Sequence, residues 1–317
     1  MGMPIIFIHK GYTSYMEFTL RQAVEFNPGH DIILLGDESN DRFDFIRHYD
    51  LKDYEQTARA FAGIYRHHST NSYEYELFCI QRWFILRDFM RDNEVSTCFV
   101  GDTDVLYYDD FEYVSKAAGD CYRCGMLIYP ERHAASAGVS FWHLSELESF
   151  CDYCYKVYAE PGGFQRLIDQ RGGNKFAGVS DMDLARGYID SIGEDKVLNL
   201  ADTINGKAID VNFNMPHGCY NGEYRLDWRK MRKAVQWQGN TPYCFNTRLN
   251  RKVQFTALHF QGPAKYAIGA YFRGSRFSGK LPLQTVFFFL NIAASIYSKT
   301  LSPLRFYLKS KLLTQKK

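Results

Sequence analysis

Short apolar runs alternate with longer segments of helical periodicity along the first hundred residues. The runs at residues 4–9, 31–37 and 95–101 are rich in Ile, Leu, Val and Phe, which is typical of strands covered on both faces. Between them, residues 15–26 and 73–92 place apolar side chains at helical spacing. This order of strands and helices predicts the opening of a parallel α/β sheet with right-handed crossovers.

The pattern becomes less regular after residue 110 but continues the same architecture. The expected regular elements are strands at 126–129, 137–142 and 253–258, a helix at 144–158, and a helix that starts after Ser180 as its cap. Residues 205–250 are rich in Gly, Asn and aromatic side chains, which predicts loops that lie over the sheet. The chain of 317 residues and its 46% apolar content allow a large core in one domain or two.

The charge of the chain is divided unevenly along its length. No Asp or Glu follows Asp227, whereas residues 228–317 carry 17 of the 38 Lys and Arg. A basic C-terminal third favours an anionic partner such as phosphate, acidic lipid or nucleic acid, but no nucleic-acid-binding module is recognisable. The mostly apolar stretch 281–297 is short for a bilayer span and is followed by Lys and Arg. We therefore expect 271–317 to be an amphipathic tail, either at an anionic membrane surface or docked on the core.

Targeting signals and cysteines add two further expectations. The N-terminus lacks the basic and apolar regions of a signal peptide, so we expect a cytoplasmic protein, with the tail at the inner face of the membrane if it binds lipid. Two pairs, Cys121/Cys124 and Cys151/Cys154, have the spacing of zinc ligands, but the segment between the pairs is longer than in a zinc ribbon. Buried free thiols explain them better than structural zinc.

Two carboxylates, Asp102 and Asp104, follow directly after the strand at 95–101. Side chains at the carboxyl end of such a strand lie where open α/β sheets bind ligands. Two carboxylates this close repel each other unless a cation lies between them, and their hard oxygen atoms suit Mg²⁺ or Mn²⁺. The pair therefore predicts a divalent metal that holds a substrate diphosphate.

A second element, His259-Phe260-Gln261-Gly262-Pro263-Ala264-Lys265, follows the last expected strand. Together with the Asp-x-Asp pair it resembles the GT-A fold of nucleotide-sugar-dependent glycosyltransferases, and it is similar to the C-terminal element of lipopolysaccharide galactosyltransferase and glycogenin-like enzymes. The resemblance implies a mixed, mostly parallel sheet flanked by helices in a domain over residues 1–270, with a nucleotide-binding half at 1–110 and an acceptor half at 111–270. Tyr266 stands where those enzymes continue with Pro-Trp, which leaves the subfamily open.

The resemblance also implies roles for these residues. Asp102, Asp104 and His259 match the metal ligands of the family, and a His ligand favours Mn²⁺ over Mg²⁺. Lys265, with Gly262, matches the contact to the diphosphate of the donor. A metal and a lysine at this place stabilise the negative charge that develops on the departing nucleoside diphosphate.

Further candidates lie in loops next to the expected strands. His9, Tyr12 and Asp37 follow the first two strands, where GT-A enzymes seat the nucleotide, and Tyr12 could stack on the base. Arg82, in the helix before the Asp-x-Asp strand, is a candidate for binding phosphate or for holding Asp102. Core packing and surface charge are the alternative explanations for all four.

Asp181 and Asp183 are the candidates for work at the acceptor. An inverting transferase needs a carboxylate to accept the proton of the acceptor hydroxyl, whereas a retaining enzyme does not. Acids are also favoured in the first turn of any helix, so helix stabilisation is the alternative. The sequence does not distinguish these outcomes.

Three functions are compatible with these residues. The first is a metal-dependent glycosyltransferase that moves a sugar from a nucleotide-diphosphate donor to a saccharide or lipid-linked acceptor in cell-surface glycan synthesis. The second is a sugar-phosphate nucleotidyltransferase, although the loop after the first strand lacks the Gly-rich, Arg-containing pattern of such enzymes. The third is a non-catalytic protein that binds lipid or another polyanion through the basic C-terminal third.

Overall fold

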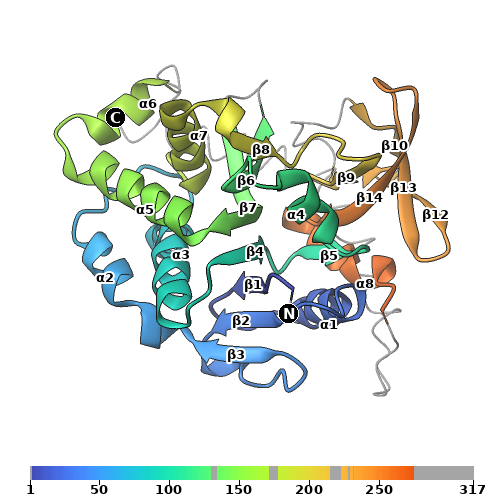
Figure 1. Ribbon diagram of the computed structural model, residues 1–317, viewed down its shortest axis with the longest axis horizontal. Coiled ribbons are helices and arrows are strands. Elements are labelled where there is room, and N and C mark those ends of the chain that lie inside the picture. The colour runs from blue at the N-terminus through green and yellow to red at the C-terminus, as the bar shows by residue number, and fades with distance from the viewer. Residues whose placement is uncertain are drawn as a thin grey trace, which may run out of the picture.

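A seven-stranded sheet forms the centre of the molecule (Figure 1). The computed structural model describes residues 2–129, 134–170, 178–214, 223–227, 229–230 and 232–274. In spatial order the strands are β3 (Arg47–Asp50), β2 (Ile32–Gly36), β1 (Ile5–Ile8), β4 (Thr97–Gly101), β7 (Ala134–His143), β6 (Cys124–Tyr129) and β8 (Val197–Asn199). Only β7 runs antiparallel to its neighbours β4 and β6. The predicted mixed, mostly parallel sheet is confirmed.

Helices cover both faces of this sheet (Figure 1). The α-helices of the described residues are α1 (Met16–Phe26), α2 (Gln56–Ala62), α3 (Tyr73–Asp92), α4 (Glu112–Ala118), α5 (Leu144–Ala159), α6 (Gly163–Gln170), α7 (Asp181–Ile192) and α8 (Ile268–Tyr271), of which α8 packs on the second sheet described below. Because successive strand residues face opposite sides, Ile6 packs into a core with Trp83 of α3, whereas Phe7 packs into a core with Met16 of α1. The fully apolar strands expected from the sequence are buried in this way on both faces.

A second sheet lies beside the first, and of its strands the sequence predicted only the one at 253–258, which is part of β14. Its strands are β12 (Gln236–Gln238), β13 (Thr241–Asn246), β14 (Arg251–His259) and β5 (Val105–Tyr107), and β9 (Lys207–Ile209) pairs with β14. A small ribbon of β10 (Leu226–Asp227) and β11 (Arg232–Lys233) is also present. The expectation of loops over residues 205–250 was therefore wrong for the described part of that segment. Its strands are short and rich in polar and aromatic residues, so no apolar run marked them.

The described residues bear on some of the other expectations. Cys124, Cys151 and Cys154 are buried and Cys121 is exposed, and in this part of the chain the group of side chains close enough to bind a metal contains no cysteine. No helix in the ranges given above has the length and apolar character needed to cross a bilayer. The expected tail at 271–317 lies outside the described residues from position 275 onward.

Candidate functional site

The turn between β4 and β5 carries both carboxylates of the Asp-x-Asp pair. Strand β4 ends at Gly101, where an added Cβ would lie 1.9 Å from the Tyr107 hydroxyl oxygen. Directly after it, the Val105 N–H donates to the Asp102 carbonyl at 3.2 Å and closes a tight turn. The chain passes from the first sheet to the second within this turn. Asp102 and Asp104 therefore lie where the two sheets meet.

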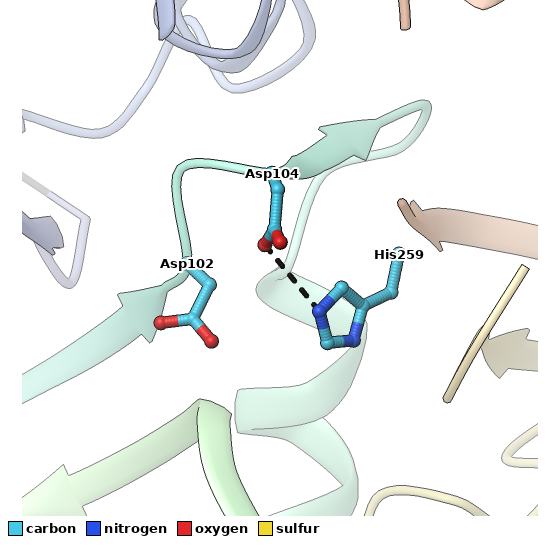
Figure 2. Close-up of side chains that lie close together, drawn as sticks. All are labelled: Asp102, Asp104 and His259. Atoms are coloured by element: carbon cyan, nitrogen blue, oxygen red, sulfur yellow. Dashed lines mark ion pairs between the residues drawn. The ribbon is translucent and has the colours of Figure 1, made fainter. Parts of the chain in front are cut away.

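His259 reaches the same place from the other end of the chain. It is the last residue of β14, and the antiparallel register sets it opposite Val105 at the start of β5. The next N–H, of Phe260, donates to the Asp104 carbonyl at 2.9 Å. One ligand atom from each of Asp102, Asp104 and His259 then lies within 4.8 Å of the others (Figure 2).

The hydrogen bonds of His259 determine which ring nitrogen faces the carboxylates. Nδ1 lies 3.0 Å from the Val211 carbonyl, which can only accept, so Nδ1 carries the hydrogen. Nε2 lies 3.3 Å from Asp104 Oδ1. Burial alone would lower the pKa of His259, but the Asp104 carboxylate outweighs it and raises that pKa. Nε2 therefore faces the negatively charged Asp104 carboxylate, and either a proton or a divalent cation can lie between the two groups.

This donor set fits a divalent metal. Two carboxylates and one imidazole are ligands that Mn²⁺ accepts, and a carbonyl on the other nitrogen of the imidazole is the usual support of a metal-bound His. Among the described residues, this is the one group of three or more acidic, His or Cys side chains that are close enough together to bind a metal.

Lys265 lies on the opposite side of Asp104 from His259. Its Nζ is 3.1 Å from Asp104 Oδ2, and its side chain is about one third exposed. Burial raises the pKa of Asp104, but His259 and Lys265 outweigh it and hold that pKa well below its usual range. Gly262 has φ 54°, a conformation that favours glycine, at the start of the helical turn Gly262–Ala267 that carries Lys265.

Arg82 joins Asp102 to Asp181. Its guanidinium lies 2.7 Å from Asp102 Oδ1 and 2.8 Å from Asp181 Oδ2, and the pKa of Asp102 is raised by burial despite this partner. Three elements thus meet here, because Arg82 comes from α3 and Asp181 begins α7. Of the two roles expected for Arg82, contact with Asp102 is the one seen.

Asp183 has a different environment from Asp181. Its Oδ2 accepts hydrogen bonds from the Ser180 N–H at 2.8 Å and from the Ser180 hydroxyl at 2.9 Å, which completes a capping box at the start of α7. Asp183 is thus a buried helix-capping residue that stands apart from the metal group, and only Asp181 is tied to Asp102.

The three residues expected at the nucleotide lie on the loops after β1 and β2. His9 Nδ1 contacts the Thr103 hydroxyl at 2.9 Å, between the two carboxylates of the pair, and burial together with Lys265 lowers the pKa of His9 to about 4. Asp37 accepts from the Gly11 N–H at 2.6 Å and from Ser39, and it caps a short helical turn. Tyr12 is 40% exposed, with the Arg42 guanidinium 4.4 Å from its ring centre. Only His9 of these three contacts the Asp-x-Asp turn directly.

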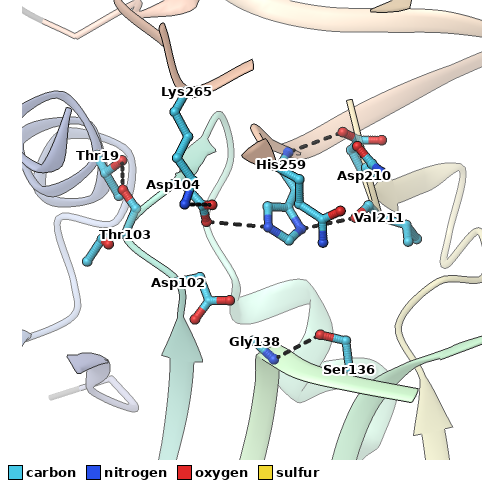
Figure 3. A network of polar contacts seen from close by, with 12 residues as sticks. Thr19, Asp102, Thr103, Asp104, Ser136, Gly138, Asp210, Val211, His259 and Lys265 are labelled. Carbon is cyan, nitrogen blue, oxygen red and sulfur yellow. Dashed lines mark hydrogen bonds and ion pairs between the residues drawn. The ribbon is translucent and has the colours of Figure 1, made fainter. Parts of the chain in front are cut away.

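Sequence reasoning missed several residues that support the site. An added Cβ at Gly138 of β7 would lie 2.1 Å from Asp102 Oδ2, so only a glycine leaves room for this carboxylate. Asp210 accepts from the His259 N–H at 3.1 Å (Figure 3). Its carboxylate also pairs with Lys233. A strand that ends in an acid, as at residues 207–210, was the available signal for Asp210.

Comparisons with known proteins gave similarities of structure only. A scan against protein-family models and a search of the curated proteins returned no match. Three similar solved structures are all glycosyltransferases. Mouse xyloside xylosyltransferase 1 is 10% identical with TM-score 0.46, over 67% of this chain and 86% of that chain. The bifunctional WbbM is 9% identical with TM-score 0.47, over 91% of this chain but only 51% of that chain. An active-site mutant of LgtC is 16% identical with TM-score 0.45, over 92% of this chain and 96% of that chain.

Proposed function

We propose that this protein is a metal-dependent glycosyltransferase that moves a sugar from a nucleotide-diphosphate donor to a saccharide or lipid-linked acceptor. The observation that carries the proposal is the group of Asp102, Asp104 and His259, whose ligand atoms lie within 4.8 Å of one another. Lys265 beside Asp104 adds the cation that a diphosphate requires.

In this proposal the three ligands hold Mn²⁺ or Mg²⁺, which would neutralise charge on the donor diphosphate. Lys265 is half-buried and already paired with Asp104, so its ammonium group is held in place before the donor arrives. Its contribution grows as the nucleoside diphosphate departs, because negative charge then accumulates on the diphosphate. Gly262 supplies the turn that presents this lysine.

In the proposal, residues on the two sides of the metal ligands bind different parts of the substrates. His9, Tyr12 and Asp37 follow β1 and β2, and we assign them to the nucleotide. Asp181 is joined to Asp102 through Arg82, and we assign Asp181 to the transferred sugar or the acceptor hydroxyl. The first half of the domain then supplies the nucleotide site, and the second half supplies Asp181 on the acceptor side.

Asp181 is the proposed catalytic carboxylate, whereas Asp183 has a structural role because its Oδ2 caps α7. If the reaction inverts the anomeric centre, Asp181 accepts the proton of the acceptor hydroxyl. If the reaction retains it, Asp181 orients the sugar. Proton NMR of the first product formed distinguishes these outcomes.

A donor-hydrolysis screen tests the proposal. The full chain is incubated with a panel of nucleotide-sugars in Mn²⁺ and, separately, in chelator, and release of nucleoside diphosphate is measured. We expect turnover of one donor class that chelator and Asp104→Ala abolish. Asp50→Asn is a matched control, because Asp50 also ends a strand of the first sheet but pairs with Lys52 outside the metal group.

The other functions predict different results. A nucleotidyltransferase would release no nucleoside diphosphate in this screen, but it would release pyrophosphate when given a nucleoside triphosphate and a sugar phosphate. A polyanion-binding protein would consume no donor, and its binding would survive Asp102→Asn and chelator. Contact of the tail with an anionic membrane is tested by sedimentation with acidic vesicles, which deletion of residues 281–317 should abolish.

A further inference from the structure

One segment of the chain, residues 210–213, contacts three of the four polar groups of His259: its N–H, its carbonyl and its Nδ1. The Asp210 carboxylate accepts from the His259 N–H at 3.1 Å, and the Val211 carbonyl accepts from the Nδ1 hydrogen at 3.0 Å (Figure 3). The Phe213 N–H donates to the His259 carbonyl at 2.8 Å. Both the main chain and the ring of His259 are thus fixed by residues 210–213, and Nε2 is left to face Asp104.

The first of these contacts depends on a buried ion pair. The side chains of Asp210 and Lys233 are 0% and 1% exposed, and their charged groups are in direct contact. The rings of Tyr224 and Phe255 lie 5.2 Å and 5.6 Å from the lysine Nζ. Burial of two charges costs about as much free energy as their attraction returns, and an apolar pair of similar volume is often equally stable. Stability of the fold alone therefore gives little reason for this pair.

The pairing of β14 shows which hydrogen-bond partner the Asp210 carboxylate replaces. Strand β9 runs parallel to β14 and its pairing ends where Ile209 lies beside Ala257. His259 lies beyond that point, so no carbonyl of β9 is available to its N–H. The Asp210 side chain takes the place of the missing strand partner and extends the pairing by one hydrogen bond to the residue that faces the carboxylates.

We propose that Asp210, held by Lys233, is a positioning residue that fixes His259 as the third ligand of the divalent cation. The inference rests on the proposed function, because it requires the metal site. The segment 210–213 limits the movement of the imidazole, so less conformational entropy is lost when the metal binds. Supports of this kind contribute about 10- to 100-fold to metal affinity.

Two double variants separate this role from the mere presence of the ion pair. Asp210→Asn with Lys233→Gln makes an amide pair that keeps an oxygen for the His259 N–H. Asp210→Leu with Lys233→Met makes an apolar pair that leaves no unpaired charge but removes this oxygen. Lys207→Met is the matched control, because it breaks the ion pair with Asp109 at the start of the same strand β9.

The readout is the dissociation constant of Mn²⁺, measured on the folded full chain by electron paramagnetic resonance of the free ion. We expect the apolar pair to weaken binding about tenfold, whereas the amide pair and Lys207→Met leave it at the wild-type value. The imidazole should also lose its fixed Nδ1-protonated form in the apolar pair alone, as seen by ¹⁵N NMR of labelled histidine. Equal Mn²⁺ affinity in the apolar and amide pairs would overturn the positioning role.

Failure of the metal site gives a different result. If the wild-type chain does not bind Mn²⁺, the proposed function fails. If the wild-type chain binds Mn²⁺ and the apolar pair binds it equally well, only the positioning role fails. Hydrogen exchange of the wild-type His259 amide needs no variant and applies even if the apolar pair does not fold. Exchange as slow as in the core of β14 supports the role, and exchange as fast as in exposed turns refutes it.

Discussion

Substitution of Gly138 by alanine tests the position of Asp102 without altering a charged or ligating side chain. The added Cβ would lie 2.1 Å from Asp102 Oδ2 and 2.9 Å from its Cγ. The backbone of Gly138 is not in the left-handed region, so alanine fits it without strain. The Asp102 N–H donates to the Gly138 carbonyl at 2.7 Å, which keeps the two main chains in register. The overlap is therefore relieved by movement of the carboxylate.

The size of that movement sets the expected effect. The oxygen has to retreat by about 1.3 Å, which is the difference between 2.1 Å and the 3.4 Å at which ordinary contact begins. A misplacement of about 1 Å at a catalytic group costs about 10²-fold in rate, or about 2.7 kcal/mol of transition-state stabilisation. The change in folding stability should be within about 1 kcal/mol, because a methyl group also restricts the unfolded chain.

The assay compares Gly138→Ala with Gly187→Ala. The Cβ added at Gly187 would lie at the similar distance of 2.2 Å from the Tyr153 hydroxyl oxygen, a group outside the metal site. Each variant is measured for its dissociation constant for Mn²⁺ and for turnover of the donor identified by the screen. We expect Gly138→Ala to lose both affinity and turnover, and Gly187→Ala to keep both. Wild-type values in a folded Gly138→Ala chain would refute the placement of Asp102 in the metal group.

Three further predictions concern the cations and the histidine around this group. The pKa of His9 is lowered to about 4 in the folded chain, so on acidification the imidazole is protonated in the unfolded chain first. The free energy of unfolding should therefore fall between pH 6.5 and pH 4. Urea titrations should show a smaller fall over this range in His9→Gln than in the wild type. Lys265→Met should raise the KM for donor about tenfold or more and lower kcat, whereas thermal stability should change by less than about 1 kcal/mol, because the pair with Asp104 is partly exposed. In Arg82→Lys a single ammonium group replaces a planar guanidinium that joins two carboxylates at 2.7 and 2.8 Å, so kcat/KM should fall while the circular dichroism spectrum stays unchanged.

The sequence predicted the first sheet well because its signals are local. Strands β1, β2 and β4 are continuous apolar runs, and α3 occupies residues 73–92 as its periodicity predicted. The second sheet was predicted by the same reasoning only in β14, expected at 253–258. Its strands β9 and β12 are three residues long, too short for any period, and they are held by pairing with distant parts of the chain.

The same distinction applies to the site. Asp102 and Asp104 could be named from the sequence because they follow an apolar run, and His259 because the element that it begins resembles a known motif. Their meeting, however, depends on the pairing of β14 with β5, which no local pattern contains. Asp210 and Lys233 were missed for another reason, although the acid at the end of β9 was a signal for Asp210. Charged residues are rarely buried, so a pattern of apolar and polar positions assigns both to the surface.

The meeting of two sheets at the turn after β4 explains why the metal group is where it is. Asp102 is bound through its N–H to Gly138 of the first sheet, and the Asp104 carbonyl is bound to the Phe260 N–H after the last strand of the second. A cation held by Asp102 and His259 would therefore bridge the two sheets beside the short turn that connects β4 to β5. The positions of the ligands then depend on how the sheets are packed. Two sets of contacts hold the ligands in place. The Asp102 N–H bond to Gly138 fixes Asp102 to the first sheet, and the contacts of residues 210–213 fix His259 in the second. This division of the site between two sheets is the reason that its electrostatic contacts, Arg82 on Asp102 and Lys265 on Asp104, come from different parts of the fold.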